Sequence, residues 1–357
     1  MKFIPSLTLN EGFFNEVVHP LLMKNYPHLK FSSALIGYGS DVLGLDTSIS
    51  MDHNWGPRLL LFLNKSDYNN YADDIKRFFQ YNLPFEYKGF PTNFTNPSYD
   101  STQRMEKTTK YPINHLIEVT TPTDYLKQYL GLNSIEKITW KEWISFADQN
   151  LIELTTGEVF NDDIGFLNEM REKLKFYPNN IRLLRLSSLW KSIGNEEPFI
   201  GRCIETQDFI GLKIISARIV NYLVKICFYL EKRYIPYSKW FGSAFKRLSS
   251  YHELEPIINK VLMENGPIKI EEHLCKAYEY TVQLHNTQDG LPILENRVQH
   301  FFSRPCRVIF AEAIIGKLQD AISIEELRGV DIDKIAIDIK LDSIDFTENN
   351  LLKEFFT

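Results

Sequence analysis

The first 150 residues alternate between apolar spacing typical of helices and short apolar runs typical of strands. Apolar residues recur every three or four positions in residues 11–25 and 67–81, which predicts a helix in each stretch. The run Leu-Leu-Leu-Phe-Leu within residues 58–63 suits a strand buried on both faces of a sheet. Two further strands are predicted at 31–38 and 115–121, which are short and rich in apolar or β-branched residues.

Turn and capping residues mark where these elements should begin and end. Asp67 stands at the start of the second helix, where it is a candidate N-terminal cap. Residues 89–112 are rich in Pro, Asn, Thr, Ser and Tyr and predict a long loop, a kind of segment that often has a function in compact domains. A further helix is predicted at 125–130, and Gly131 is expected to end it.

After about residue 140 the apolar spacing is helical. The fold class is therefore predicted as α+β, with a small mixed sheet flanked by helices in residues 1–150. A helical bundle domain follows in residues 151–357, with a short acidic C-terminal extension that begins near residue 324. The helices of the second half are predicted at 163–175, 180–193, 205–233, 239–248, 254–264 and 270–285.

Composition narrows the class of protein. The chain has 357 residues, a formal net charge of −6 and 44% hydrophobic residues, which are ordinary values for a globular protein of two domains. The acidic balance argues against a protein that coats DNA. Because the chain has no apolar run of about 20 residues and no signal peptide at its start, we expect no membrane association and a cytoplasmic location. Four scattered cysteines indicate neither a zinc site nor a disulfide framework.

The segment from Gly37 to Arg58 contains the residue types of a phosphate-handling site. Gly39 would let the backbone approach a phosphate closely, and the Ser40 hydroxyl and nearby N–H groups would donate to its oxygens. Asp52 would hold a magnesium ion, which prefers oxygen ligands and often bridges a carboxylate to phosphate. The alternative is a glycine-rich turn followed by a surface Asp, because Gly, Ser and Asp are common turn residues.

This segment resembles the nucleotidyltransferase superfamily that includes DNA polymerase beta, kanamycin nucleotidyltransferase and the MNT-type antitoxins. The motif of that superfamily is Gly-Ser, a spacer of about ten residues, and Asp-x-Asp, and here Gly39-Ser40 is followed by Asp52-His53-Asn54. The longer sequence around this motif, residues 39–58, resembles a little-characterised bacterial branch of that superfamily with a domain of unknown function. The other segments that resemble this branch are 117–121, 237–242 and Arg304-Pro305.

The resemblance implies Mg²⁺ or Mn²⁺ as cofactor and a nucleoside triphosphate as substrate. The nucleoside monophosphate would move to a hydroxyl or phosphate of an acceptor, which could be a small molecule, a tRNA or a protein. Asp52, Asn54 and Glu118 would stand at the metal positions, with Asp52 and Glu118 catalytic. Asn54 departs from the motif, because it offers one neutral oxygen where the family has a carboxylate. Gly39, Ser40, Asn54, Arg58 and Lys239 are the candidate nucleotide contacts.

The order of residues before the strand at 58–63 sets a geometric expectation. If the strand extended back through the motif, Asp52 and Asn54 would share one face and His53 would lie on the other. Arg58 would share the face of Asp52 but lie about 20 Å along the strand, unless Gly56 and Pro57 bend the chain.

Two alternatives remain open. Asn54 is also compatible with a catalytically degenerate binding or regulatory protein on the same fold, similar to an antitoxin. The helical half resembles HEPN-type domains, some of which are ribonucleases with an Arg-x4–6-His pattern, and Arg247 and His252 fit that spacing. In the same half, Arg202 and Glu205 are spaced as an ordinary helical ion pair.

Overall fold

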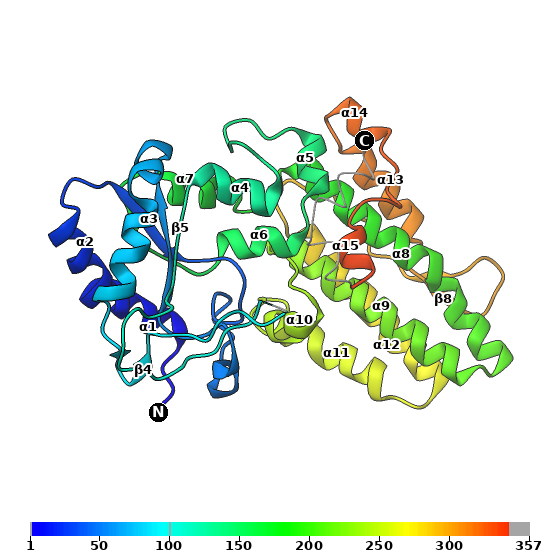
Figure 1. Ribbon diagram of the computed structural model, residues 1–357. Coiled ribbons are helices and arrows are strands. Elements are labelled where there is room, and N and C mark those ends of the chain that lie inside the picture. The colour runs from blue at the N-terminus through cyan, green and yellow to red at the C-terminus, as the bar shows by residue number, and fades with distance from the viewer. Residues whose placement is uncertain (1, 100, 343–357) are drawn as a thin grey trace. The chain divides into compact units, whose positions relative to one another are not determined.

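The computed structural model describes residues 2–99 and 101–342, so residues 343–357 of the expected C-terminal extension lie outside the described residues. The chain divides into two compact units (Figure 1). Unit 1 comprises Met1–Lys137 and Asn150–Lys175, and unit 2 comprises Ile138–Gln149 and Phe176–Thr357. The sequence placed a single boundary at residue 150. In the structure the chain instead enters unit 2, returns to unit 1 and then leaves it again.

A four-stranded sheet forms the centre of unit 1. Strands β2 and β5 run parallel, whereas β1 runs antiparallel to both of its neighbours. This small mixed sheet with its flanking helices confirms the predicted α+β class. In sheet order the strands are β5 (Leu116–Thr120), β2 (Arg58–Leu63), β1 (Phe31–Leu35) and β6 (Glu158–Asp162).

Three of these strands are predicted from the sequence, and β6 is not. The bounds of β2 agree with the prediction, while β1 and β5 are shorter at their ends. Strand β6 has the sequence Glu-Val-Phe-Asn-Asp, and it is half-buried along its whole length at the edge of the sheet. It therefore has neither an apolar run nor a strict alternation by which it could be recognised.

Helices cover both faces of the sheet. On one face Leu59, Leu61 and Ile117 belong to a core that also contains Phe79 of α3. On the other face Phe62 contacts the ring of Tyr125 on α4 edge-to-face, with the centroids 5.1 Å apart. The helices of unit 1 are α1 (Ser6–Phe13), a π-helical turn (Phe14–Val18), α2 (His19–Asn25), α3 (Lys65–Asn82), α4 (Pro122–Leu130) and α7 (Phe166–Lys173).

The capping residues are partly as predicted. Gly131 ends α4 in the left-handed conformation with a φ of 64°, which confirms its expected role. The expectation for Asp67 is wrong, because α3 begins earlier. Asn64 is the cap, and its side-chain oxygen accepts a hydrogen bond from the backbone N–H of Asp67 at 3.0 Å.

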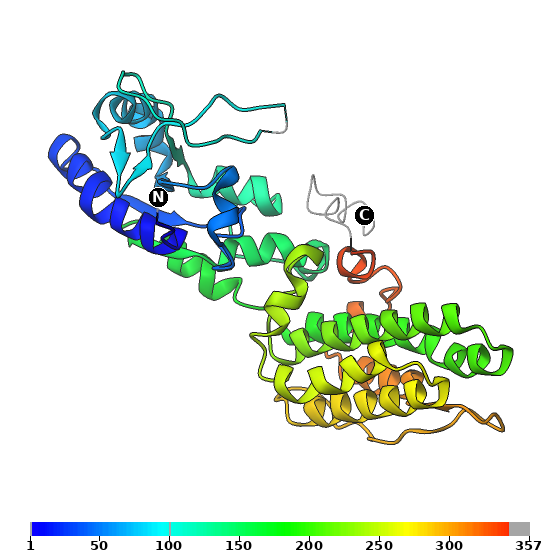
Figure 2. The ribbon, with the colours of Figure 1, turned by 90° about the horizontal axis from the view of Figure 1, so that it is seen from below.

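The predicted loop at 89–112 contains a long hairpin, described for residues 92–99 and 101–106, which we call the arm. Thr95 N–H donates to the carbonyl of Arg104 at 2.9 Å, and Phe94 pairs with Met105 in an isolated bridge. Figure 2 shows the arm in cyan, extending away from the sheet. Two short strands, β3 (Glu86–Tyr87) and β4 (Phe90–Pro91), pair directly before it.

Unit 2 is a bundle of helices. The long helices α8 and α9 pack against each other, α12 packs against α9, and α13 packs against α8 (Figure 2). Helix α8 continues well beyond the predicted end at 193 and includes Pro198. The helices are α5 (Trp140–Ser145), α8 (Asn179–Thr206), α9 (Phe209–Leu230), α10 (Ser238–Phe245), α11 (Tyr251–Met263), α12 (Pro267–Asn286), α13 (Ala311–Asp320), α14 (Glu325–Arg328) and α15 (Ile337–Lys340). The short strands β7 (Gln299–His300) and β8 (Arg307–Val308) pair with each other, and α6 (Asp148–Thr155) joins the two units in sequence.

A buried ion pair lies inside unit 2. Nη1 of Arg185 is 2.8 Å from Oδ1 of Asp148, and both side chains are 1% exposed. The hydroxyls of Tyr177 and Tyr229 also donate to Asp148, at 2.8 and 2.9 Å, and the backbone N–H of Ile235 donates at 2.8 Å. Burial raises the pKa of Asp148, and the charge of Arg185 opposes this rise.

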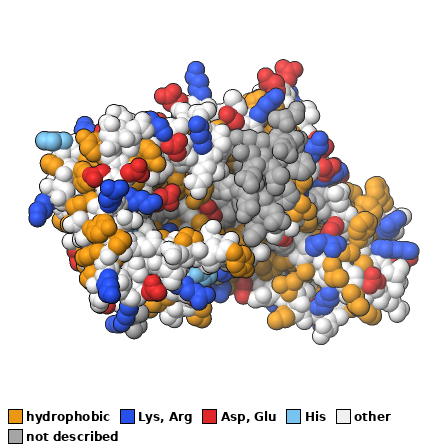
Figure 3. Space-filling model, viewed as in Figure 1, with side chains coloured by type: hydrophobic (Ala, Val, Ile, Leu, Met, Phe, Trp, Pro, Cys, Tyr) orange, Lys and Arg blue, Asp and Glu red, His pale blue; other side chains and the backbone are white. Residues whose placement is uncertain are grey.

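The surface carries both signs of charge. On the face seen in Figure 3, Lys and Arg side chains are interspersed with Asp and Glu side chains. Among residues 2–99 and 101–342, no helix combines the length and apolar character that crossing a bilayer requires.

Candidate functional site

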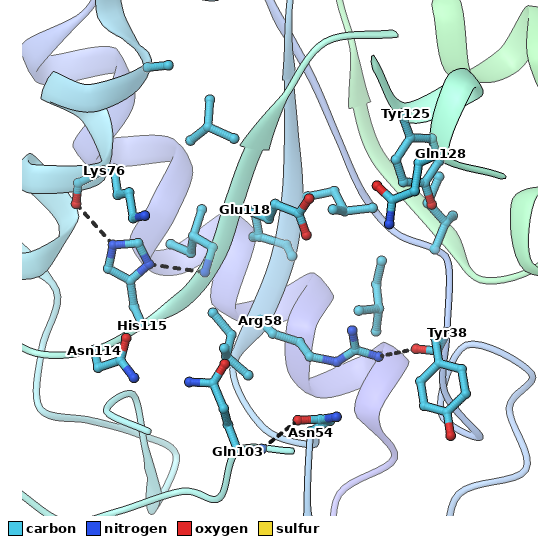
Figure 4. A pocket seen from close by; sticks show the side chains of 18 of the residues that line it. Tyr38, Asn54, Arg58, Lys76, Gln103, Asn114, His115, Glu118, Tyr125 and Gln128 are labelled. Carbon is cyan, nitrogen blue, oxygen red and sulfur yellow. Dashed lines mark hydrogen bonds between the residues drawn. The ribbon is translucent and has the colours of Figure 1, made fainter. Parts of the chain in front are cut away.

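A pocket of about 590 Å³ lies in unit 1, at the end of the sheet where β2 and β5 begin and β1 ends. Helix α3 contributes Lys76 to its wall, and helix α4 contributes Gln128 (Figure 4). The arm contributes Gln103, the residue next to its turn. Sheet, two helices and arm therefore enclose one space of the size of a small-molecule site.

Arg58 and Glu118 point into this pocket from neighbouring strands (Figure 4). Leu60 is the register partner of Glu118, and Arg58 lies two residues before Leu60, so both charged side chains project from the same face of the sheet. Partial desolvation in the pocket raises the pKa of the Glu118 carboxyl above its ordinary value, and the charge of Arg58 opposes this rise. Glu118 is thus accessible to a ligand and has a carboxyl that binds a proton more readily than usual.

The turn that contains Gly39 and Ser40 wraps around an ion pair between Asp41 and Arg58. Gly39 has a φ of 138°, and a Cβ there would overlap the carboxylate of Asp41 and crowd the guanidinium of Arg58. The need for glycine at this position is therefore explained by the ion pair without any phosphate. Tyr38, directly before Gly39, lines the pocket and is 59% exposed, whereas Gly39 and Ser40 are not among its described lining residues.

Asp52 and His53 do not lie on a strand, so the expected alternation of faces is wrong. Residues Ser48–Asp52 form a 3-10 helix, and β2 begins only at Arg58. The Asp52 side chain is 64% exposed, and its Oδ1 lies 3.0 Å from Nδ1 of His53. Slight desolvation acts to raise the pKa of Asp52, but the hydrogen bond and charge of His53 outweigh it and lower the pKa. Asp52 is not among the described residues that line the pocket.

Asn54 lines the pocket and holds the arm. Its backbone has a φ of 47°, a left-handed conformation that Asn tolerates better than most residues. The backbone N–H of Asn54 donates to the carbonyl of Gln103 at 2.7 Å, and the N–H of Gln103 donates to Oδ1 of Asn54 at 2.8 Å. The one side-chain oxygen that Asn54 could offer to a metal therefore already accepts a hydrogen bond.

Two further residues that line the pocket, His115 and Lys76, are not singled out by any pattern in the sequence. His115 lines the pocket, and its Nδ1 accepts from the N–H of Ile117 at 3.1 Å while Nε2 lies 3.0 Å from the carbonyl of Lys76. These partners require a neutral ring with the proton on Nε2, in agreement with the way burial lowers the pKa of His115. Lys76 could have been suspected only from its helical spacing with Tyr68 and Ala72, which line the same pocket.

The side-chain oxygens of Asn54 and Glu118, the expected metal ligands that line the pocket, are more compatible with one metal ion than with two. Glu118 offers a carboxylate inside the pocket, the kind of ligand that shares a magnesium ion with substrate phosphates. Within the part of the chain that the structure describes, no group of three or more His, Cys, Asp and Glu residues is arranged to hold a metal ion. The complete set of Asp52, Asn54 and Glu118 stays a prediction, because only Asn54 and Glu118 line the pocket.

The remaining candidates belong to unit 2. Lys239 is exposed on α10, with its Nζ 5.1 Å from the centroid of the Trp240 ring. Arg247 lies in the turn after α10, and His252 lies in the first turn of α11, where its ring contacts Tyr251. Arg202 and Glu205 form the expected exposed helical pair, with 2.9 Å between Nη1 and Oε2.

Comparison with known proteins gives one match. Residues 143–241 match a family described as a domain of unknown function, DUF4037, and the match covers less than half of the chain. The matched segment includes β6 and α7 of unit 1 together with α8 and α9 of unit 2, so it does not coincide with either compact unit. The chain matches no curated protein and no solved structure.

Proposed function

We propose that unit 1 binds a nucleoside triphosphate in the pocket and transfers its nucleoside monophosphate to a hydroxyl or phosphate of an acceptor. The observation that carries the proposal is the convergence of Arg58 and Glu118 on one face of one pocket, beside the turn at Gly39. A cation for phosphate and a carboxylate that takes up protons readily are the two groups that this transfer needs. The resemblance of Gly39-Ser40 to the Gly-Ser pair of the nucleotidyltransferase motif supports the same reaction.

The proposed step has a simple balance. The acceptor hydroxyl gives its proton to the Glu118 carboxylate while its oxygen forms a bond to the α-phosphorus. The bond from the α-phosphorus to the oxygen that bridges to the β-phosphorus breaks, and pyrophosphate leaves with that electron pair. Arg58 offsets negative charge on the phosphates. A magnesium ion held by Glu118 and the phosphates would further neutralise this charge.

Calorimetry with ATP, GTP, CTP and UTP, with and without Mg²⁺, tests the binding. We expect magnesium-dependent binding of at least one triphosphate, and a loss of affinity of about tenfold or more in Glu118→Gln and in Arg58→Gln. Glu86→Gln is the matched control, because Glu86 is an exposed acid of unit 1 that is not among the described lining residues. Absence of binding for all four triphosphates would sink the proposal.

A binding or regulatory role without turnover is the second candidate. It is favoured by the position of Asp52 outside the pocket lining and by the use of the Asn54 oxygen by Gln103. Release of pyrophosphate in the presence of candidate acceptors separates the two functions. Triphosphate binding with no pyrophosphate release from any acceptor class would favour the regulatory role.

A further inference from the structure

Asp41 is a buried acid that the sequence analysis does not single out. Its residue is 2% exposed, and its carboxylate accepts from Nη2 of Arg58 at 2.9 Å to each oxygen and from Nε at 3.3 Å. The same Nη2 also donates to the carbonyl of Tyr38 at 3.2 Å. Among the described residues, the hydrogen bonds of the guanidinium therefore use Nε and Nη2, and Nη1 is left for a ligand.

Helix α1 holds both members of the pair. The hydroxyl of Ser6 donates to Oδ2 of Asp41 at 2.9 Å, and Nδ2 of Asn10 donates to that hydroxyl at 3.0 Å. Oδ1 of Asn10 accepts from the backbone N–H of Arg58 at 2.7 Å. Ser6, Asn10, Asp41 and Arg58 thus form a closed ring of hydrogen bonds, and the two residues of α1 are fully buried.

We infer that Asp41 is a positioning residue that orients the guanidinium of Arg58 toward the phosphates of the bound nucleotide. An arginine without a fixed partner samples many rotamers, and fixing it before binding removes part of the entropy cost of binding. The ring through α1 keeps the carboxylate of Asp41 in place, and Gly39 gives the pair its space. This inference rests on the proposed function, because it assigns a phosphate ligand to Arg58.

The test compares ATP with adenosine in calorimetric titrations of the full chain. Asp41→Asn places an amide N–H or a single oxygen against the guanidinium and so releases it. We expect the affinity for ATP to fall about tenfold while the affinity for adenosine changes less than about twofold, since adenosine has no phosphate. If Asp41 only stabilised the fold, its replacement would lower the affinities for ATP and for adenosine by similar factors.

Asp46→Asn is the matched control. Asp46 accepts from the N–H of Ser6 and from the indole N–H of Trp55, so it lies in the same neighbourhood without a bond to Arg58. We expect it to leave the ratio of ATP to adenosine affinity unchanged. The double variant Asp41→Asn/Arg58→Gln should lose no more ATP affinity than Arg58→Gln alone, because Asp41 acts through Arg58.

The outcomes separate the two proposals. If the wild-type chain binds ATP and Asp41→Asn keeps its ratio of ATP to adenosine affinity, the inference is wrong and the proposed function stands. If the wild-type chain binds no triphosphate, the proposed function is wrong, and the inference about Asp41, which depends on it, is wrong as well. If Asp41→Asn does not fold, Ser6→Ala removes one donor to Asp41, and an unchanged ratio in that variant overturns the inference.

Discussion

Asn54 and Gln103 hold each other by two hydrogen bonds, although they are 49 residues apart in sequence. Each backbone N–H donates to an oxygen of the other residue, and these two bonds attach the arm, close to its turn, to the segment before β2. Asn54, at which the resemblance to the nucleotidyltransferase motif would lead us to expect a second carboxylate, therefore has a structural role.

Replacement of Asn54 should loosen the arm in a graded way. Asn54→Asp keeps an oxygen for the N–H of Gln103, whereas Asn54→Gly and Asn54→Ala remove it at a cost of about 1 kcal/mol. Asn54→Ala carries a further cost of about 1 kcal/mol, because alanine resists the left-handed backbone. Hydrogen exchange at the Gln103 amide should therefore be slowest in wild type and Asn54→Asp, faster in Asn54→Gly and fastest in Asn54→Ala. Equal exchange in all four proteins would contradict this reading.

Glu118 should give the transfer reaction its pH dependence. Because the pKa of Glu118 is raised, the rate should increase with pH around a midpoint above the ordinary value for Glu, and Glu118→Gln should lose at least about 100-fold in rate. The rate of pyrophosphate release as a function of pH measures this. A rate in Glu118→Gln equal to that of wild type would remove Glu118 from the mechanism.

The same shift predicts an effect on stability. A raised pKa in the folded state means that the folded chain binds the proton more tightly than the unfolded chain, so the stability contributed by Glu118 is lost as pH rises through the folded pKa. Glu118→Gln does not titrate. Its melting temperature relative to wild type should therefore increase from about pH 4 to about pH 8. A relative melting temperature that falls with pH would show the opposite shift.

Asp52 and Glu118 should differ in their effect on metal-dependent binding. The exposed pair of Asp52 with His53 is worth less than about 1 kcal/mol, and Asp52 is not among the described residues of the pocket lining. We expect Asp52→Ala to change the magnesium-dependent affinity for ATP less than about twofold, and Glu118→Ala to lower it about tenfold or more. Calorimetry with and without Mg²⁺ decides between them. Loss of binding in Asp52→Ala would instead support the metal set implied by the resemblance.

Tyr38 should stack against the base of a nucleotide. The residue is 59% exposed and lines the pocket, and its own backbone carbonyl accepts a hydrogen bond from Nη2 of Arg58. Stacking of a base on an aromatic ring is worth about 1–3 kcal/mol. Tyr38→Ala should therefore lose about tenfold in affinity for both ATP and adenosine, whereas Tyr38→Phe should retain it. Equal adenosine affinity in wild type and Tyr38→Ala would refute the stack.

Two arginines of α8, Arg185 and Arg202, allow the contribution of a buried ion pair to stability to be compared with that of an exposed one. Arg185→Gln leaves the Asp148 carboxylate buried without its cation, which should destabilise the chain by about 3–5 kcal/mol. Arg202→Gln, near the other end of α8, removes an exposed pair and should cost less than about 1 kcal/mol. Thermal unfolding of the two variants compares them directly. Similar losses from both would show that burial does not control the strength of the pair.

The sequence predicts those parts of the fold that local patterns determine. The apolar run makes β2 recognisable with its bounds, and Gly131 marks the end of α4. Strand β6 is missed because it is polar at both ends and becomes a strand only through its pairing with β1. Helix α8 is predicted too short because a proline inside a helix, here Pro198, normally ends or kinks it. In the structure α8 continues through Pro198 and packs against α9 and α13.

The candidate site is predicted less completely than the fold. Glu118 is singled out because the resemblance implies a carboxylate on a later strand, and Arg58 because it begins the strand predicted at 58–63; both line the pocket. Asp41 is missed because its ion pair with Arg58 forms between residues 17 apart, after the turn at Gly39 has folded back, and no periodic pattern reports such a contact. The expected placement of Asp52 on a strand is wrong because capping by Thr47 and Ser50 starts a 3-10 helix there.

The interleaving of the two units has a consequence for synthesis on the ribosome. Unit 1 needs β6 to pair with β1, yet the twelve residues Ile138–Gln149, which belong to unit 2, are made before β6. The sheet of unit 1 can therefore be completed only after the chain has emerged past Asp162, by which time the first piece of unit 2 is already outside the exit tunnel. A nascent chain stalled at residue 150 should expose the edge of β1 and recruit chaperones, whereas one stalled well beyond residue 175 should not.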